Sequence, residues 1–219
     1  NDIDHPVLVF VRGDGSDMSE AIVEASSRKD RFDHVGIYLP PCFLWRHLVE
    51  IDYASEAVAE MVRRDVDLGT EHAYVLEAHP DLGVSATPYS QFYNRTGGDS
   101  HLLFMEFPVV CDVKKSIINA LRVVGEPYNA AFLEHIGENR GQGYYCSELV
   151  AEFCRDTSGG KIFHNHKLNF CSADGSLIPF WKDYYHELGL SVPLDEKGTS
   201  PQSVYERCLE LADTQLSSS

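Results

Sequence analysis

The sequence lacks both a long apolar run and an excess of positive charge. No stretch approaches the roughly 18 apolar residues that a membrane-spanning helix needs, so we expect no transmembrane segment. The chain carries 18 Lys and Arg against 34 Asp and Glu, a net charge of −16, and the acidic residues are spread along it. A nucleic-acid partner is therefore not expected, because binding to phosphates relies on a basic surface. A surface of this charge favours cationic groups instead, such as the free amine of a peptide.

The cysteines lack the spacing of a disulfide framework, and no CxxC is present for zinc or redox chemistry. We expect most of them to be buried thiols and one to be reactive. They stand at positions 42, 111, 146, 154, 171 and 208. Repeats and low-complexity segments are absent as well, and the 219 residues are 43% hydrophobic, enough to bury one core. We expect a single domain over residues 1–219 with an inserted segment at about 41–70.

The chain begins at Asn1, with neither an initiator Met nor a basic and apolar leader. This start is typical of a protein from which a signal peptide or an expression tag has been removed. The sequence does not indicate an oligomeric state.

Hydrophobic periodicity divides the rest of the chain into strands and helices. Apolar runs predict strands at 6–12, 34–39, 73–78 and 101–107, the last of them as a central strand. Helical spacing predicts helices at about 16–26, 53–64 and 113–124, and one that begins near position 146. After residue 158 we expect short apolar pieces among turns, with residues 217–219 frayed.

Cys146 is the cysteine whose setting suits a nucleophile. Cys146, Leu149, Val150 and Phe153 fall at i, i+3, i+4 and i+7, which places Cys146 at or near the N-terminus of an amphipathic helix. A thiol there feels the positive end of the helix dipole, which raises its thiolate fraction. The alternative is a small buried hydrophobe, which is our interpretation of Cys154 two turns along the same helix.

A cysteine nucleophile also needs a base within hydrogen-bond reach and a third polar group that orients the imidazole. Among ten histidines, His34 is the best placed, because it opens a strand and shares a face with Gly36, which leaves room for a side chain opposite. Glu77 ends the adjacent strand candidate and could orient His34. The alternatives are a structural histidine at 34 and a solvated carboxylate at 77, with His79 as a rival on the same strand face.

A metal site is a further alternative. His164 and His166 form an HxH pair that can chelate, with Asp174 or Cys171 as a third ligand. Neither of these lies at a good spacing, so we expect no metal and no cofactor.

Four segments carry a family resemblance. They are SEAIVEASSRKDRFDHVGIYL, VLEAHPDLGV, EPYNAAF and YYCSELVAEFC. Together they resemble the YiiX/YebB-like branch of the permuted NlpC/P60 superfamily over most of residues 6–155. Papain-like enzymes usually carry Cys, His and the polar residue in that order, whereas the permuted branch places His and the polar residue first. The order here is His34, Glu77, Cys146.

The resemblance implies a papain-like α+β fold, in which a helix that carries the Cys packs on an antiparallel sheet or half-barrel that carries the His. It implies a cysteine peptidase or amidase, with Cys146 as nucleophile, His34 as general base and acid, and Glu77 as the group that orients it. Tyr145 or Tyr128 could line the site or help to bind the oxyanion, although the backbone N–H of Cys146 is the firmer donor.

The implied substrate is a peptide or small-molecule amide, such as a peptidoglycan stem peptide or a lysine-containing or γ-linked fragment. A cell-envelope or secreted location would suit such an enzyme. Two other functions stay open. A thioester or lipid acyltransferase, or an acyl hydrolase, would use the same Cys-His pair and would need an apolar channel or a membrane-facing segment, neither of which the sequence shows. A non-catalytic peptide- or ligand-binding module would be expected to lack the Cys or the His.

Overall fold

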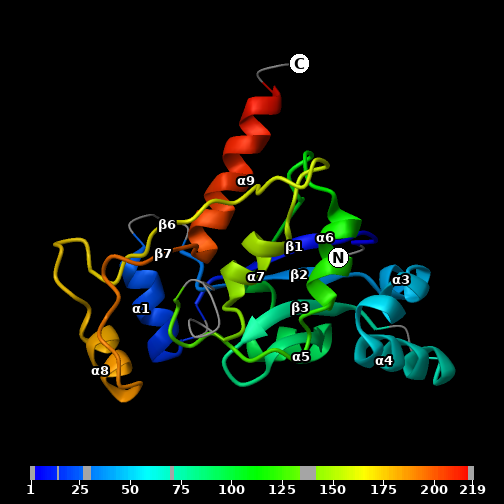
Figure 1. Cartoon of the computed structure of the whole chain (residues 1–219), viewed down its shortest axis with the longest axis horizontal. Helices are drawn as coiled ribbons and strands as arrows, with labels where there is room; N and C mark the ends of the chain where they lie inside the picture. The colour runs from blue at the N-terminus through cyan, green and yellow to red at the C-terminus, as the bar shows by residue number, and fades with distance from the viewer. Residues whose placement is uncertain (1–2, 14, 27–30, 70–71, 134–141, 217–219) are drawn as a thin grey trace.

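A five-stranded antiparallel sheet forms the centre of the molecule (Figure 1). The computed structural model describes residues 3–13, 15–26, 31–69, 72–133 and 142–216. The strand order is β4-β3-β2-β1-β5. The strands are β1 Val7–Val11, β2 His34–Leu39, β3 Tyr74–His79, β4 Gly83–Pro88 and β5 Leu102–Met105. A second sheet has two short strands, β6 His166–Lys167 and β7 Lys197–Gly198.

Helices surround this sheet. They are α1 Asp17–Ala25, α2 Pro41–Arg46, α3 Leu48–Ala54, α4 Glu56–Asp67, α5 Tyr89–Arg95, α6 Val113–Leu121, α7 Cys146–Phe153, α8 Pro179–Glu187 and α9 Pro201–Leu216, with a 3₁₀ turn η1 at Asp99–His101. Helices α1 and α8 lie at one end of the molecule, α3 and α4 lie at the other, and α9 projects from the body (Figure 1). Within the described part of the chain, no helix is long and apolar enough to cross a membrane.

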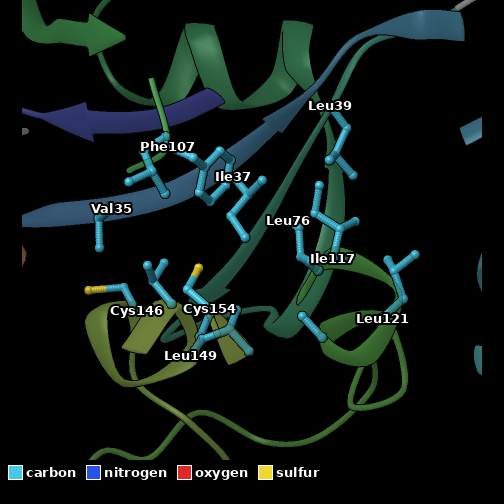
Figure 2. Close-up of a cluster of buried hydrophobic side chains, with 14 of the residues drawn as sticks. Val35, Ile37, Leu39, Leu76, Phe107, Ile117, Leu121, Cys146, Leu149 and Cys154 are labelled. Carbon is cyan, nitrogen blue, oxygen red and sulfur yellow. The ribbon is translucent and has the colours of Figure 1, made fainter. Parts of the chain in front are cut away.

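The main core lies between the sheet and helices α6 and α7. Figure 2 shows Val35 and Ile37 of β2 directed toward Cys146 and Leu149 of α7. All four side chains are buried, and burial of a side chain the size of leucine contributes about 1.5–3 kcal/mol. Apolar burial therefore fixes the helix that carries Cys146 against the strand that begins at position 34.

Several predicted elements are confirmed. The strands predicted at 6–12, 34–39 and 73–78 correspond to β1, β2 and β3, within one residue at each end. The predicted helix at 16–26 is α1, in which the Ser16 side chain accepts a hydrogen bond from the Ser19 N–H as a helix cap.

The strand predicted at 101–107 is shorter than expected, and its central position is wrong. β5 covers only Leu102–Met105 and pairs with β1 alone, at the edge of the sheet. All four of its residues are only half-buried, as expected for an edge strand that lacks a neighbour on one side.

The helix predicted at 53–64 is also wrong in its bounds. Ser55 ends α3 and begins α4, because its side chain accepts a hydrogen bond from the Val58 N–H as an N-cap. On α4, Val58 and Val62 are buried, whereas Ala57 is exposed. Residues 41–67 therefore form three short helices in place of one.

The prediction of short apolar pieces among turns after residue 158 is also wrong, because it missed two helices and a sheet. This part of the chain forms α8 and α9 as well as the second sheet. Trp181 and Tyr185 are one helical turn apart and both are buried, as are Val204 and Cys208, so each helix is held by one apolar stripe. Residues 217–219 lie outside the described residues.

Candidate active site

The N-terminus of α7 is held in place by hydrogen bonds on both sides of Cys146. The Tyr145 N–H donates to the Glu148 carboxylate at 3.3 Å, within the first turn. Ser147 Oγ donates to the Thr199 carbonyl at 3.0 Å, and the Thr199 N–H donates to the Tyr145 hydroxyl at 3.1 Å. The position of the Cys146 backbone is therefore tied to the segment between β7 and α9.

The segment before α7 passes very close to residues 127–129. Gly143 has φ +80°, and a Cβ at this position would lie 1.6 Å from the Pro127 carbonyl oxygen, so only glycine fits. The Tyr144 N–H donates to the Pro127 carbonyl at 3.2 Å, and the Asn129 N–H donates to the Tyr144 carbonyl at 3.1 Å. This pairing brings Tyr128 to the start of α7.

His34 joins the start of α7 to the sheet. Its Nε2 lies 2.7 Å from Oε2 of Glu77, a carboxylate with no solvent exposure. The Cys146 side chain also lies close enough to the imidazole to raise the pKa of His34. Because Nε2 is engaged with the carboxylate, Nδ1 is the ring nitrogen left for the sulfur.

Gly36 lets β3 approach β2 closely beside this pair. A Cβ on Gly36 would lie 2.7 Å from Cγ1 of Val75 and 3.4 Å from Cβ of Glu77. The room that Gly36 leaves is thus taken by side chains of β3. The absence of a side chain on Gly36 allows the Glu77 side chain to run along the sheet to His34.

Arg95, which was not among the residues predicted for the site, completes the chain of polar groups. Its Nη2 donates to both Glu77 oxygens, at 2.7 and 2.6 Å, from the last residue of α5. A carboxylate in the apolar run YVLEA does indicate that a cation is needed, because an unpaired buried charge is costly. The sequence contains 18 Lys and Arg, and only the fold shows which of them pairs with Glu77.

These contacts shift the pKa values of both partners. Burial lowers the pKa of His34, but hydrogen bonds to Cys146 and Glu77 outweigh it and raise that pKa to about 10. Burial raises the pKa of Glu77, but His34 and Arg95 outweigh it and lower that pKa to about 2. At neutral pH the pair is an imidazolium and a carboxylate, so an adjacent thiolate has a cation to pair with.

His79 lies beside this pair without replacing either member. Its ring centroid is 6.3 Å from that of His34, and its Nδ1 accepts a hydrogen bond from the Asp81 N–H at 3.2 Å. Burial lowers the pKa of His79, and the nearby Arg95 lowers it further. Of the two candidates on this strand face, Glu77 is the one in contact with His34.

The two tyrosines differ in what their hydroxyl groups do. The Tyr145 side chain is buried, and its hydroxyl accepts the Thr199 N–H. Tyr128 is half-buried, and burial together with the nearby Cys146 raises its pKa well above the ordinary value. Tyr128 is therefore neutral at physiological pH and can donate a hydrogen bond beside the sulfur.

Cys146 lies where two hollows meet. The first, the polar cleft, contains His34, His79, Asp81 and Arg95. The second, the apolar cavity, is lined by residues 166–170, residues 199–202, α1 and the start of α8, together with aromatic side chains that include Phe132. The two hollows share Ile22, Asp33, Tyr128 and Cys146.

The other cysteines and the HxH pair have different surroundings. Cys111, Cys154 and Cys208 are buried free thiols, and Cys171 is half-exposed. His164 and His166 are exposed. Across the ranges that the structure describes, no group of three or more His, Cys, Asp or Glu is arranged to hold a metal ion.

Comparison with known proteins gives two findings. A family model described as "Permuted papain-like amidase enzyme, YaeF/YiiX, C92 family" matches residues 7–208. The chain is also similar to the solved structure of metalloprotein yiiX from Escherichia coli O157:H7, with 20% sequence identity and a TM-score of 0.59 over 92% of this chain and 91% of that one. Similarity at this identity shows a shared fold alone. No curated protein matches the chain.

Proposed function

The chain belongs to the C92 family of permuted papain-like amidases, and on that basis we propose that Cys146 is its nucleophile, His34 its general base and acid, and Glu77 the group that orients His34. Membership confirms the predicted α+β permuted papain-like fold and the predicted class of enzyme, a papain-like cysteine peptidase or amidase. The residue roles and the substrate are the proposal.

One observation carries this assignment. One nitrogen of the His34 ring lies 2.7 Å from a fully buried carboxylate, and the side chain of Cys146, at the first position of α7, lies close enough to the ring to raise the pKa of His34. A nucleophile, a base and an orienting group in sequential contact are what amide cleavage by cysteine requires. Three distant parts of the chain supply them.

In the first half of the reaction, the Cys146 thiolate attacks the carbonyl carbon of the amide and forms a C–S bond. The carbonyl oxygen takes up the negative charge and is held by the backbone N–H of Cys146, with the Tyr128 hydroxyl as a second donor. His34 then gives its proton to the leaving nitrogen, the C–N bond breaks, and an amine departs. A thioester to Cys146 remains.

In the second half, neutral His34 takes a proton from water. The resulting hydroxide attacks the thioester carbon, the C–S bond breaks, and the acid is released. Cys146 returns as a thiolate and His34 as an imidazolium. Throughout, Glu77 keeps Nε2 engaged, so that Nδ1 stays directed at the sulfur.

The substrate that we propose is a peptide, of the kind found in peptidoglycan stem peptides or in lysine-containing and γ-linked fragments. Two features support a substrate with a positive charge. The protein has a net charge of −16, and Asp33 and Asp81 line the polar cleft. The two cations of this cleft, His34 and Arg95, are in contact with Glu77, so a protonated amine would be drawn to Asp33 and Asp81.

The test is a panel of defined peptidoglycan fragments, γ-glutamyl amides and lysyl amides, with products identified by mass spectrometry. Wild-type protein is expected to cleave at least one class, and Cys146→Ala to cleave none. Cys171→Ala is the matched control, because it removes a half-exposed thiol that lines neither hollow and should retain activity. Equal turnover by the Cys146→Ala protein would refute the assignment of the nucleophile.

A further inference from the structure

His79 lines the polar cleft together with Cys146 and has no role in the chemistry described so far. It is the last residue of β3, two positions after Glu77, so both side chains lie on the same face of the sheet. A tight hairpin fixes its main chain, because the Leu82 N–H donates to the His79 carbonyl at 3.1 Å and His79 pairs with Gly83 of β4. The ring is therefore held on a rigid support in the cleft that contains the proposed nucleophile.

The hydrogen bond from Asp81 determines which nitrogen of the His79 ring carries the proton. The Asp81 N–H donates to Nδ1 at 3.2 Å, so Nδ1 uses its lone pair and carries no hydrogen. Burial lowers the pKa of His79, and the positive charges of Arg95 and His34 lower it further. Glu77 and Asp81 act in the opposite direction and are outweighed. The ring is therefore neutral at pH 7, and its one N–H hydrogen lies on Nε2.

The Nε2–H of His79 is a hydrogen-bond donor without a protein acceptor. No residue in the described part of the chain accepts a hydrogen bond from it. Because Nδ1 is engaged with the turn, Nε2 is the polar atom that the half-buried ring presents to the cleft. A fixed neutral donor beside Cys146 is suited to bind an acceptor atom of the substrate.

The charges in the cleft restrict which acceptor this can be. Asp33 and Asp81 line the cleft, and its cations His34 and Arg95 contact Glu77. A carboxylate on the ligand would be repelled by the two aspartates, and a protonated amine has no lone pair with which to accept. A neutral oxygen avoids both problems. An amide substrate supplies one in the carbonyl of each peptide group beside the scissile bond.

We propose that His79 is a substrate-binding residue, whose Nε2–H donates a hydrogen bond to the carbonyl oxygen of a peptide group next to the scissile amide. This inference rests on the proposed amidase function and adds a specificity-determining residue to it. An amide within a peptide is then favoured over an isolated amide, because only the former has a flanking carbonyl.

Two substitutions of His79 separate the roles of its two nitrogens. In His79→Asn, the side-chain oxygen can replace Nδ1 as acceptor for the Asp81 N–H, but no donor remains at the position of Nε2. In His79→Gln, the longer side chain can bring its amide nitrogen to that position. On the fastest-cleaved peptide of the panel, we expect His79→Asn to raise KM about 3- to 10-fold with little change in kcat, and His79→Gln to restore KM.

His164→Asn is the matched control, because it makes the same change at an exposed histidine outside the cleft and should leave KM unaltered. An unchanged KM in His79→Asn, or no recovery in His79→Gln, would overturn the inference.

A change in the substrate tests whether the contact is direct. Two analogues of the same peptide carry an alkene in place of the peptide group before or after the scissile amide, so each lacks one carbonyl. For one of the two, the wild-type KM should rise about 3- to 10-fold, and His79→Asn should raise it no further, because the same hydrogen bond is already lost. Additive effects of the variant and the analogue in both series would mean that His79 acts only through the shape of the cleft, and the inference would fail.

Binding separates this inference from the proposed function. If no amide of the panel is cleaved, calorimetry with N-acetyl-alanyl-lysyl-alaninamide compares wild-type and His79→Asn proteins. Binding that is about 3- to 10-fold weaker in the variant would leave the role of His79 standing while the proposed function fails. Equal binding by the two proteins, or no binding, would overturn the role of His79 as well. If amides are cleaved and His79→Asn matches wild type, the role of His79 alone fails.

Discussion

Glu77 is a buried carboxylate that contacts two cationic side chains, His34 and Arg95. Removal of one partner from a buried ion pair destabilises a protein by about 3–5 kcal/mol, because the other charge is left without compensation. The arrangement fixes the imidazole and keeps it protonated. Replacement of Glu77 should therefore change both the pH dependence of activity and the stability.

Glu77→Gln should move the alkaline limit of activity to lower pH. Without the carboxylate, the pKa of His34 falls from about 10 toward its ordinary value, so the imidazolium is lost earlier as pH rises. The measurement is kcat/KM against pH, and we expect a shift of about one unit or more, since one pKa unit corresponds to about 1.4 kcal/mol of interaction. Glu106→Gln is the control, because Glu106 is an exposed partner of His5. An alkaline limit unchanged from wild type would show that Glu77 does not act on His34.

The same pair should make the free energy of unfolding depend on pH in a defined window. The raised pKa of His34 means that its contribution is complete below pH 6.5 and is lost as pH rises through about 10. The lowered pKa of Glu77 means that its contribution is complete above pH 4.5 and is lost as pH falls toward about 2. Both contributions are therefore complete between pH 4.5 and 6.5.

Urea unfolding of wild-type and Glu77→Gln proteins across this range checks the point. The difference in free energy of unfolding should be largest inside the window, at about 3–5 kcal/mol, and should shrink toward about pH 3 and about pH 10. A difference that stays constant with pH would mean that the variant acts by altered packing alone.

At the scale of elements, the start of α7 depends on a glycine that no other residue can replace. Gly143→Ala would place a methyl group 1.6 Å from the Pro127 carbonyl oxygen, so the segment would have to move away from residue 127. Gly175 is the matched control, because it has φ +85° with nothing within 4 Å of its Cβ position.

We expect Gly175→Ala to cost only the left-handed backbone strain of about 1–2 kcal/mol. Gly143→Ala should cost at least about 2 kcal/mol more and should lower kcat/KM, because overpacking forces the backbone to shift. Chemical denaturation of both variants gives the comparison. Equal losses of stability would argue that the contact between Gly143 and Pro127 is unimportant.

The elements with a strong local pattern could be predicted from the sequence. β1 and β2 are apolar runs of the right length, and α7 places Cys146 and Leu149 on one face. Within the site, His34 and Glu77 could be proposed because each occupies an end of a predicted strand, and the structure places them in contact.

The missed elements have weaker signals or depend on partners far away in the sequence. β4 has the sequence GVSATP, with little apolar alternation, and becomes a strand by pairing with β3. The edge position of β5 depends on pairing across the sheet, which local pattern does not determine. α8 did have a signal, since Trp181 and Tyr185 are spaced by one helical turn and follow a proline that can occupy the first turn.

At the scale of the whole molecule, the net charge of −16 should affect which substrates arrive at the site. A negative surface attracts cationic peptides from a distance, and salt screens this attraction with a Debye length of about 10 Å at 0.1 M. We expect kcat/KM for a lysine-containing peptide amide to fall several-fold from low salt to about 0.5 M salt. An uncharged amide with the same scissile bond should change little. The same salt response for both substrates would exclude electrostatic attraction as a determinant of specificity.

The most direct test of the account is the rate at which each thiol is alkylated. Cys146 is only 6% exposed and Cys171 is half-exposed, so access alone predicts that Cys171 reacts first. The account predicts the reverse, because the thiolate is the reacting form and His34 stabilises it. Iodoacetamide labelling at about pH 6, followed by peptide mapping, should modify Cys146 at least about 10-fold faster than Cys171. His34→Ala should abolish that difference. Faster labelling of Cys171 in the wild-type protein would contradict the account.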